Sequence, residues 1–446
     1  MNPRAFSWLQ IVRLGLVQSA LGAIVVMTTS TLNRIMVVEL TLPAALPGAL
    51  VALHYGMQVL RPRLGHGSDV GGRTTPWIVG GMSLLALGGF GSAVATAWMT
   101  SNLSAGIALA VFSFLIVGIG VGACGTTLLV LLAKRTPEDQ RAAAATIVWV
   151  MMIAGFILTA TIAGHFLDPY SPGRLIAVAG GVSAAAMAIT ALSVWRVEGP
   201  PPNLPTMLAT PPPRAFLLAL TEVWNEPRAR RFAIFIFVSM LAYSAPELIL
   251  EPFAGSVFGF TPGESTTLAG VQHGGTLAGM ILIGIVAGFI GCRRIASMQT
   301  LTIGSCVASA AALVGLAAAS LSAPTWPLRA IVFMLGLGNG VYAVAAIGSM
   351  MALASFGQES REGVRIGLWG AAQAIAFGLG GFIGTLAVDI ARFVIGSTTS
   401  AYAMIFAGEA SLFLVSAALA MRVYREDGRA ASGFNRNLAI SEVGRG

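Results

Sequence analysis

Charged side chains are scarce in this sequence. Asp, Glu, Lys and Arg together make up 10% of its 446 residues, while 56% are hydrophobic. A soluble domain carries about 25% charged residues. No single soluble core can bury so much apolar surface, so the surroundings of the chain must be lipid. The composition therefore excludes soluble folds and predicts an integral membrane protein.

Cysteine and lysine are rare as well. Cys124 and Cys306 fall within expected spans and Cys292 in a short loop, without metal-type spacing, so we expect no disulfide framework. Lys134 is the one lysine among 26 basic residues. The arginines form no block with interleaved aromatic residues. The net charge of +8 therefore reflects membrane topology, and no nucleic-acid partner is expected.

Long apolar runs, in contrast, recur about twelve times, each long enough to cross a bilayer. The N-terminal one follows a basic start without a small-residue cleavage site, so it is interpreted as a first span rather than a signal peptide. The expected spans are 12–32, 43–61, 76–98, 105–132, 143–166, 175–195, 232–252, 264–290, 299–320, 327–351, 366–388 and 401–422.

A segment rich in Pro and Arg, 198–231, separates the sixth expected span from the seventh. It predicts a cytoplasmic linker between an N-terminal six-helix half, 1–197, and a C-terminal six-helix half, 232–423, followed by a cytoplasmic tail, 424–446. The expected fold class is thus all-α integral membrane, with about twelve transmembrane helices in two pseudo-symmetric halves.

The basic residues fall mainly on one side of the expected spans. With the N-terminus placed inside, the inner segments hold 22 of the 26 basic residues and the outer segments four. Cytoplasmic loops of membrane proteins carry such an excess. Both termini are therefore predicted to be cytoplasmic.

A weak internal repeat supports the division into halves. Two stretches of the first half match stretches of the second at shifts of 220 and 219 residues. The matched pairs are Arg141 with Arg361, Trp149 with Trp369, Gly164 with Gly384, His54 with His273, and Gly56 with Gly275.

The loop GHGSDVGGRT, 65–74, follows the second expected span. Its Gly65, Asp69, Gly72 and Arg73 resemble the cytoplasmic signature of the major facilitator superfamily in residue type, spacing and position. The resemblance implies the two-half fold of that superfamily. It also implies that the Asp69 carboxylate caps or pairs across the halves and favours one conformation.

Polar residues inside expected spans are candidate functional groups, because a charge at the bilayer centre is costly. Glu247 and Glu251 lie four apart, on one helix face, between Pro246 and Pro252, which should break or kink the helix. They form a protonatable pair or a polar anchor for a ligand, or else they lie near the outer interface, where acids are tolerated.

Asn33 and Arg34 end the first expected span, at the corresponding place in the first half. An ion pair between Arg34 and Glu251 would explain both charges and would stabilise an inward-open state.

Two histidines stand at matching places in the halves. His54 has Gln58 one turn further along the same face, and His273 lies beside Gln272 and among several glycines. Neutral imidazole is a good metal ligand, although a histidine in a membrane also commonly hydrogen-bonds to a neighbouring helix. Both readings stay open.

Three longer stretches resemble the PucC and LhaA family of phototrophic bacteria. They are 31–69, APELILEPFAGSVF at 245–258, and 361–385. That family is the bacteriochlorophyll-delivery branch of the major facilitator superfamily. One departure is Ala245-Pro246-Glu247, where the family carries a Gln-Asp type of sequence.

The resemblance implies an assembly factor for light-harvesting complexes in the bacterial photosynthetic inner membrane. Its cargo would be bacteriochlorophyll, with His54 and His273 as possible axial ligands of the magnesium and with Gln58, Gln272, Glu247, Glu251, Asn33 and Arg34 as further contacts. Its partners would be lipids, antenna polypeptides, and the pigment-synthesis and protein-insertion machinery.

Three other functions compete with this one. The chain could be an alternating-access transporter of a small amphipathic solute or porphyrin precursor, or a helix-docking assembly factor without pigment. An integral-membrane enzyme is not expected, because the sequence has no prenyl-diphosphate aspartate motif, no nucleotide loop and no nucleophile with a base.

Overall fold

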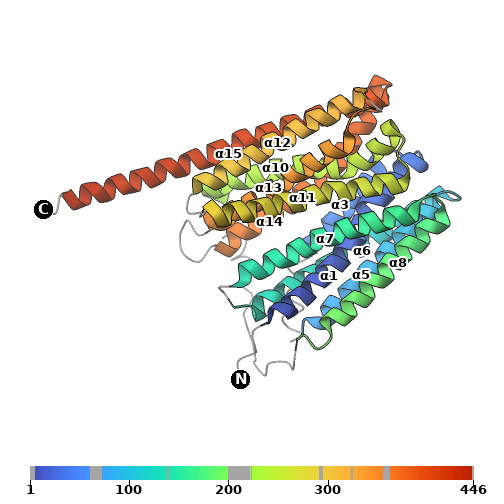
Figure 1. The fold of residues 1–446 in the computed structure, drawn as a ribbon, viewed down its shortest axis with the longest axis horizontal. Helices are drawn as coiled ribbons and strands as arrows, with labels where there is room; N and C mark the ends of the chain where they lie inside the picture. The colour runs from blue at the N-terminus through green and yellow to red at the C-terminus, as the bar shows by residue number, and fades with distance from the viewer. Residues whose placement is uncertain are drawn as a thin grey trace.

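The computed structural model describes residues 6–60, 73–137, 140–198, 221, 224–290, 295–322, 325–354 and 362–443. Every regular element in these ranges is helical, and the helices run side by side as one elongated bundle (Figure 1). The expected all-α fold is confirmed.

Most helices of the first part of the chain lie in the lower half of Figure 1. The first apolar segment, Trp8–Glu39, is one continuous helix in which α1 (Trp8–Val26) and α2 (Leu32–Arg34) alternate with π-helical turns at Met27–Thr31 and Ile35–Glu39. The others are α3 (Ala45–Gly56) with a 3₁₀ turn at Met57–Leu60, α5 (Thr75–Trp98), α6 (Leu103–Arg135), α7 (Arg141–Leu167) and α8 (Pro172–Val194). The helices α1, α5, α6, α7 and α8 are among those in the lower half, whereas α3 lies beside the helices of the second part.

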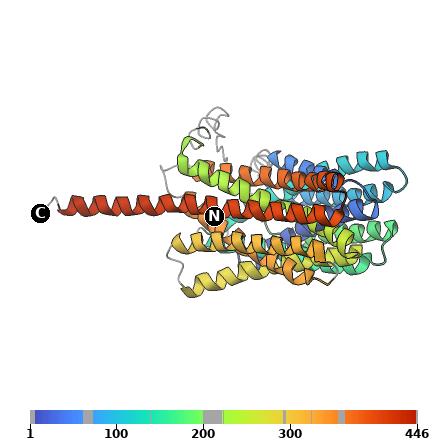
Figure 2. The ribbon, with the colours of Figure 1, turned by 90° about the horizontal axis from the view of Figure 1, so that it is seen from above.

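The helices of the second part lie in the upper half of Figure 1. They are α10 (Pro227–Phe258), α11 (Pro262–Ile290), α12 (Ile295–Ser322), α13 (Leu328–Ala354), α14 (Glu362–Ile395) and α15 (Thr398–Val443). The last of these continues through most of the segment expected to form a separate tail and projects beyond the bundle (Figure 2).

Ten helices of the described ranges are long and apolar enough to cross a membrane. The expected second and eighth spans are not among them. The helix α3 has only 12 residues. The helix α11 has 29 residues and is long enough to cross a membrane, but the side chains from residue 284 to its end lie outside the described part of the chain.

Local sequence signals account for where several helices begin. Ser7 starts α1 through a capping box with Gln10, and the side chains of Asn102 and Ser171 accept the first free amide hydrogens of α6 and α8. Such residues satisfy backbone donors that have no partner within the helix.

The prolines inside α10 do not break it. The helix is continuous from Pro227 to Phe258 although Pro246 and Pro252 both lie within it. The expected break is absent, because in a packed membrane helix a neighbouring group can satisfy the carbonyl that a proline leaves without its donor. The other expectation, a kink at these prolines, stays a prediction.

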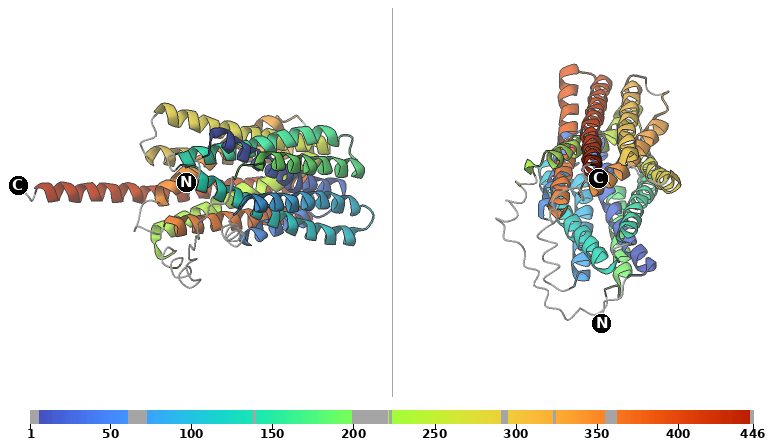
Figure 3. Two further views of the ribbon diagram at one scale, coloured as in Figure 1. Left: turned by 90° about the horizontal axis from the view of Figure 1, so that it is seen from below. Right: turned by 90° about the vertical axis from the view of Figure 1, so that its left-hand side faces the viewer.

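The bundle has two ends, and both chain termini lie at the same one (Figure 1). We name this end, which holds the starts of α1, α5 and α10, the terminal face; the right-hand view of Figure 3 looks onto it. The other end, which holds Glu39 and the connections after α5, α7, α10 and α14, is named the opposite face.

Candidate functional site

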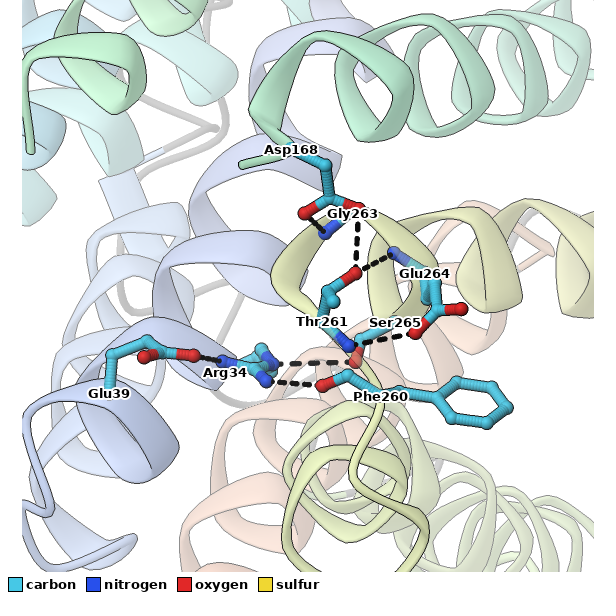
Figure 4. Close-up of polar contacts among 8 residues, drawn as sticks. All are labelled: Arg34, Glu39, Asp168, Phe260, Thr261, Gly263, Glu264 and Ser265. Carbon is cyan, nitrogen blue, oxygen red and sulfur yellow. Dashed lines mark hydrogen bonds and ion pairs between the residues drawn. The ribbon is translucent and has the colours of Figure 1, made fainter. Parts of the chain in front are cut away.

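Arg34 lies at the opposite face and joins the two halves of the bundle. Its side chain is 2% exposed, and its Nη1 is 2.5 Å from Glu39 Oε1 (Figure 4). Its Nη2 donates to the Phe260 carbonyl at 2.5 Å, and its Nε donates to Ser265 Oγ at 3.3 Å. One buried guanidinium thus holds the connection between α10 and α11 against α2.

The expected ion pair between Arg34 and Glu251 is not formed; Glu39 takes that role. The reason is local. The residues Ile35–Glu39 form a π-helical turn, in which residues five apart lie on the same side of the helix. Arg34 and Glu39 are five apart, so the chain supplies its own counter-ion.

Glu251 is buried in the same region and is 1% exposed. Its Oε1 accepts a short hydrogen bond from Ser30 Oγ, across the halves. Glu247, one turn earlier, is half-buried. The two acids therefore do lie along one stretch of α10, and Glu251 is the one that contacts the first half.

Asn33 forms a further contact across the halves. Its Nδ2 donates to the Leu248 carbonyl at 2.5 Å. This carbonyl lacks its ordinary helical partner, because residue 252, four positions on, is a proline without an N–H. Pro252 therefore leaves the Leu248 carbonyl of α10 free, and the Asn33 side chain donates a hydrogen bond to it.

Asp168, at the end of α7, caps the beginning of α11. Its Oδ2 accepts from Thr261 Oγ1 at 2.6 Å, and its Oδ1 accepts from the Gly263 amide at 3.1 Å (Figure 4). Close contact requires glycine here: a Cβ at Gly263 would lie 2.3 Å from the Gly164 carbonyl oxygen of α7.

Asp389, on α14, caps the beginning of α3 in the same manner. Its carboxylate accepts from the Ala44 amide at 3.0 Å and from the Ala45 amide at 2.7 Å. Free amides and the helix dipole make a helix N-terminus favourable for an anion. Each half of the protein thus places a carboxylate on a helix N-terminus of the other half.

These two caps are related by the internal repeat. Ala44 and Gly263 are separated by 219 residues, one of the shifts that align the halves, and Asp168 and Asp389 are separated by 221. Sequence reasoning missed both acids. The signal available was their near-repeat spacing, a few residues beyond the matched glycines Gly164 and Gly384.

His54 is 1% exposed and therefore fully packed. Its Nε2 lies 3.3 Å from Gln58 Nε2, so the expected neighbour on the same helix face is in contact with it. The adjacent Tyr55 ring and the Tyr243 ring each lie 5.6 Å from the Phe377 ring, which brings α3, α10 and α14 together.

His273 has a more open environment. It is half-buried, and its ring lies 4.9 Å from the Phe156 ring of α7. A Cβ at Gly274 would meet nothing within 4 Å, whereas one at Gly275 would lie 2.2 Å from the Phe333 carbonyl oxygen. Gln272 is buried. Of the glycines around His273, Gly274 leaves space, while Gly275 packs against α13.

Most of the signature loop lies outside the described residues, including Gly65, Asp69 and Gly72. Arg73 is described and exposed. The two residues after it are anchored by the buried Glu198, whose carboxylate accepts from the Thr74 and Thr75 amides at 2.6 and 2.8 Å. Burial raises the pKa of Glu198, but these hydrogen bonds outweigh it and leave the pKa below its usual value.

The described residues contain no group of three or more His, Cys, Asp or Glu side chains that could hold a metal ion.

The helical bundle with its two halves has the major facilitator fold. The crystal structure of the nucleoside transporter NupG (D323A mutant) superposes with a TM-score of 0.68 at 14% identity, covering 93% of this chain and 100% of that one. At this identity the likeness concerns the fold alone.

The family is defined by sequence. The family model described as PUCC protein matches residues 31–428, and the chain belongs to this family. A protein named Protein PucC from Rhodobacter capsulatus is 29% identical over 94% of this chain and 93% of its own length. The resemblance of the three stretches is thereby confirmed.

A second relative corrects one expectation. A protein of Rhodobacter capsulatus named Bacteriochlorophyll synthase 44.5 kDa chain is 49% identical over 95% of this chain and 97% of its own length. Its name links it to an enzymatic activity and contradicts the expectation that an enzymatic role is absent. The absence of a prenyl-diphosphate motif, a nucleotide loop and a nucleophile with a base was a weak reason for that expectation, because a membrane subunit of an enzyme need not carry them.

Proposed function

We propose that this chain holds bacteriochlorophyll between its halves and delivers it to light-harvesting antenna polypeptides as these assemble. Its membership of the PUCC family supports light-harvesting assembly as the process in which it acts. The name of the 49% identical relative supports bacteriochlorophyll as the molecule concerned. In this proposal the pigment is the cargo of the protein and not a resident cofactor.

The environment of His273 carries the proposal. Its imidazole is half-buried, lies beside the Phe156 ring, and is followed by Gly274, which leaves open space. A flat macrocycle needs an apolar wall, a small residue beside it and a nitrogen ligand for its magnesium. Neutral imidazole can supply that nitrogen.

His54 ranks below His273 as a ligand. It is 1% exposed and in contact with Gln58, so a macrocycle could approach only after repacking. We therefore assign the axial ligand to His273 and a supporting role to His54 and Gln58. The assignment differs from the sequence expectation, in which the two histidines were equivalent.

The sidedness also belongs to this proposal. An excess of basic residues on the terminal-face side of the spans favours a cytoplasmic terminal face in the inner membrane. The closed contacts around Arg34 would then leave the cargo site reachable from the cytoplasm or from the bilayer. The division at 1–197, 198–231, 232–423 and 424–446 is proposed on the same grounds.

Alternating-access transport of an amphipathic solute is the second candidate. The observation that favours it is the set of polar contacts across the halves at one end of the bundle, which includes those of Asp168 and Asp389. Contacts of this kind can open and close as the halves rock.

An absorption spectrum tests the first proposal. The full chain is purified in mild detergent from a phototroph, beside His273→Ala, His54→Ala and the control His165→Ala, whose side chain is exposed. Near-infrared bands should co-purify with the parent protein and the control, be lost with His273→Ala, and be weakened with His54→Ala.

A colourless parent protein that still retains antenna polypeptides would point to docking without pigment. Bands that survive His273→Ala unchanged would remove that residue as the ligand. Uptake of a solute into proteoliposomes, abolished by Asp389→Asn, would favour transport.

A further inference from the structure

A surface pocket at the terminal face is not used by the function proposed above. It measures about 540 Å³ and is lined by Arg13, Leu192, Trp195 and Arg196. Because α1 begins at Trp8 and α8 ends at Val194, the pocket lies at the level where these two helices leave the apolar part of the bundle.

Arg13 is fixed in place by the end of α8. Its Nη2 donates to the Trp195 carbonyl at 2.6 Å and to the Leu192 carbonyl at 3.2 Å. The last carbonyls of a helix lack partners within the helix, and a cation there is favourable. The helix end therefore holds one positive charge at the edge of the pocket.

Arg196 supplies a second positive charge. It is exposed, and its φ of 55° places a non-glycine residue in the left-handed region directly after α8. No acidic side chain lines the pocket in the described part of the chain. Two arginines thus line one pocket that has no carboxylate among its described lining residues.

Exposed apolar residues continue from the pocket along both helices. On α1 they are Leu9, Val12 and Leu16, spaced three and four apart and 71%, 38% and 40% exposed. On α8 they are Ile189 and Leu192, 40% and 72% exposed, and the Trp195 ring follows them at 66%. Tryptophan is typical of the boundary between the hydrocarbon and the headgroups.

We propose that this pocket binds an anionic phospholipid. The phosphate lies between Arg13 and Arg196, and the acyl chains lie along the apolar residues of α1 and α8. A zwitterionic headgroup fits less well, because its own cation repels a second arginine. Basic pockets between helices at the cytoplasmic leaflet bind anionic headgroups in this way.

Quenching of tryptophan fluorescence by brominated lipids tests the proposal. The full chain is delipidated in detergent and titrated with brominated phosphatidylglycerol or brominated phosphatidylcholine, with Trp195→Phe defining the fluorescence of that residue. Brominated phosphatidylglycerol should quench Trp195 at a lower mole fraction. Arg196→Gln should weaken its binding roughly fivefold.

The control is Arg230→Gln, which removes an exposed arginine from the terminal end of α10 and should leave the preference intact. Equal quenching of the parent protein by both lipids would overturn the proposal, as would a preference that survives Arg196→Gln. Complete displacement by inorganic phosphate would also overturn it, since the pocket would then bind a free anion. Because Arg13→Gln can loosen α8, Arg196→Gln is the deciding variant.

Discussion

At the residue scale, Glu198 shows how one buried carboxylate fixes the segment next to the signature loop. It accepts from both Thr74 and Thr75, and its carbonyl accepts from Arg135 Nη2 at 2.6 Å. It therefore joins the end of α8, the start of α5 and the end of α6 at the terminal face.

The lowered pKa of Glu198 leads to a pH prediction. A carboxyl whose pKa is lower in the folded state adds stability above its unfolded pKa, here near 4.5, and loses it as the pH falls through the folded value. Glu198→Gln should cost about 2 kcal/mol at pH 7 and should flatten the acid side of the stability curve. Thermal unfolding in detergent between pH 3 and pH 7, at roughly unit steps, measures this.

Thr74→Val is the matched control for that experiment, because it removes one hydroxyl donor and keeps the carboxylate. Thr74→Val should lower the stability less than Glu198→Gln does, and its stability should still fall at low pH much as that of the parent protein does. If the stability of Glu198→Gln fell at low pH as steeply as that of the parent protein, Glu198 would not be the source of this pH dependence.

Single residues were also where sequence reasoning was least complete. Arg34 was recognised, but its partner Glu39 was not, because a helical pattern of 3.6 residues puts positions five apart on different faces. The π-helical turn that brings them together has no sequence signal of its own. Asp168 directly follows α7, and Asp389 lies in the last two turns of α14, just beyond the expected span; polar residues at such places are in most proteins simply solvated.

At the element scale, α10 shows how a proline can create a contact instead of a break. Pro252 leaves the Leu248 carbonyl free, and Asn33 from the other half fills that place. The expectation of a broken or kinked helix considered α10 alone. Whether the helix continues through Pro252 also depends on the neighbouring helix, which here supplies the Asn33 side chain as a donor.

A double-mutant cycle tests this link. Asn33→Ala should destabilise the parent protein by about 1–3 kcal/mol, since it leaves a buried acceptor unpaired. In a Pro252→Ala background the helix recovers its own hydrogen bond, so the same Asn33→Ala change should cost much less. Thermal unfolding of the four proteins gives the coupling energy; a coupling near zero would show that the two residues act separately.

The number and order of the helices could be predicted well from sequence, because apolar runs of span length are a strong signal. The end of α15 could not, since a polar C-terminal segment contains no information on whether it continues the preceding helix. The shortness of α3 was missed because the apolar run there outlasts the α-helix.

At the scale of the whole molecule, the two carboxylate caps join the halves at the opposite face, at positions about one repeat apart in the sequence. Asp168 and Asp389 act on different helix pairs, α7 with α11 and α14 with α3. Their effects should therefore add, as they do for separate sites.

We predict that Asp168→Asn combined with Asp389→Asn opens the opposite face. Each cap is worth about 1 kcal/mol, so loss of both should shift the ratio of open to closed molecules roughly thirtyfold. Spin labels at Ser101→Cys and Thr399→Cys, which are exposed on opposite halves of this face, report the distance in a background without the native cysteines. Double electron–electron resonance should reveal a longer-distance population.

Glu264→Gln is the control for this pair. Glu264 lies in the first turn of α11, is exposed, and accepts from the Thr261 amide at 2.9 Å. It should leave the distance distribution as in the parent protein. A double variant with the parent distribution would mean that the caps do not govern closure.

The Asn33 contact and the two caps share one property with an energetic consequence. Each joins a side chain to a backbone amide or carbonyl at a helix end or beside a proline, and water can take the place of either partner once the halves part. Opening then exchanges one set of hydrogen bonds for another and leaves few polar atoms unsatisfied. The open and closed states of this face should therefore differ little in free energy. A cargo molecule that binds one of them modestly better can then shift the equilibrium between them.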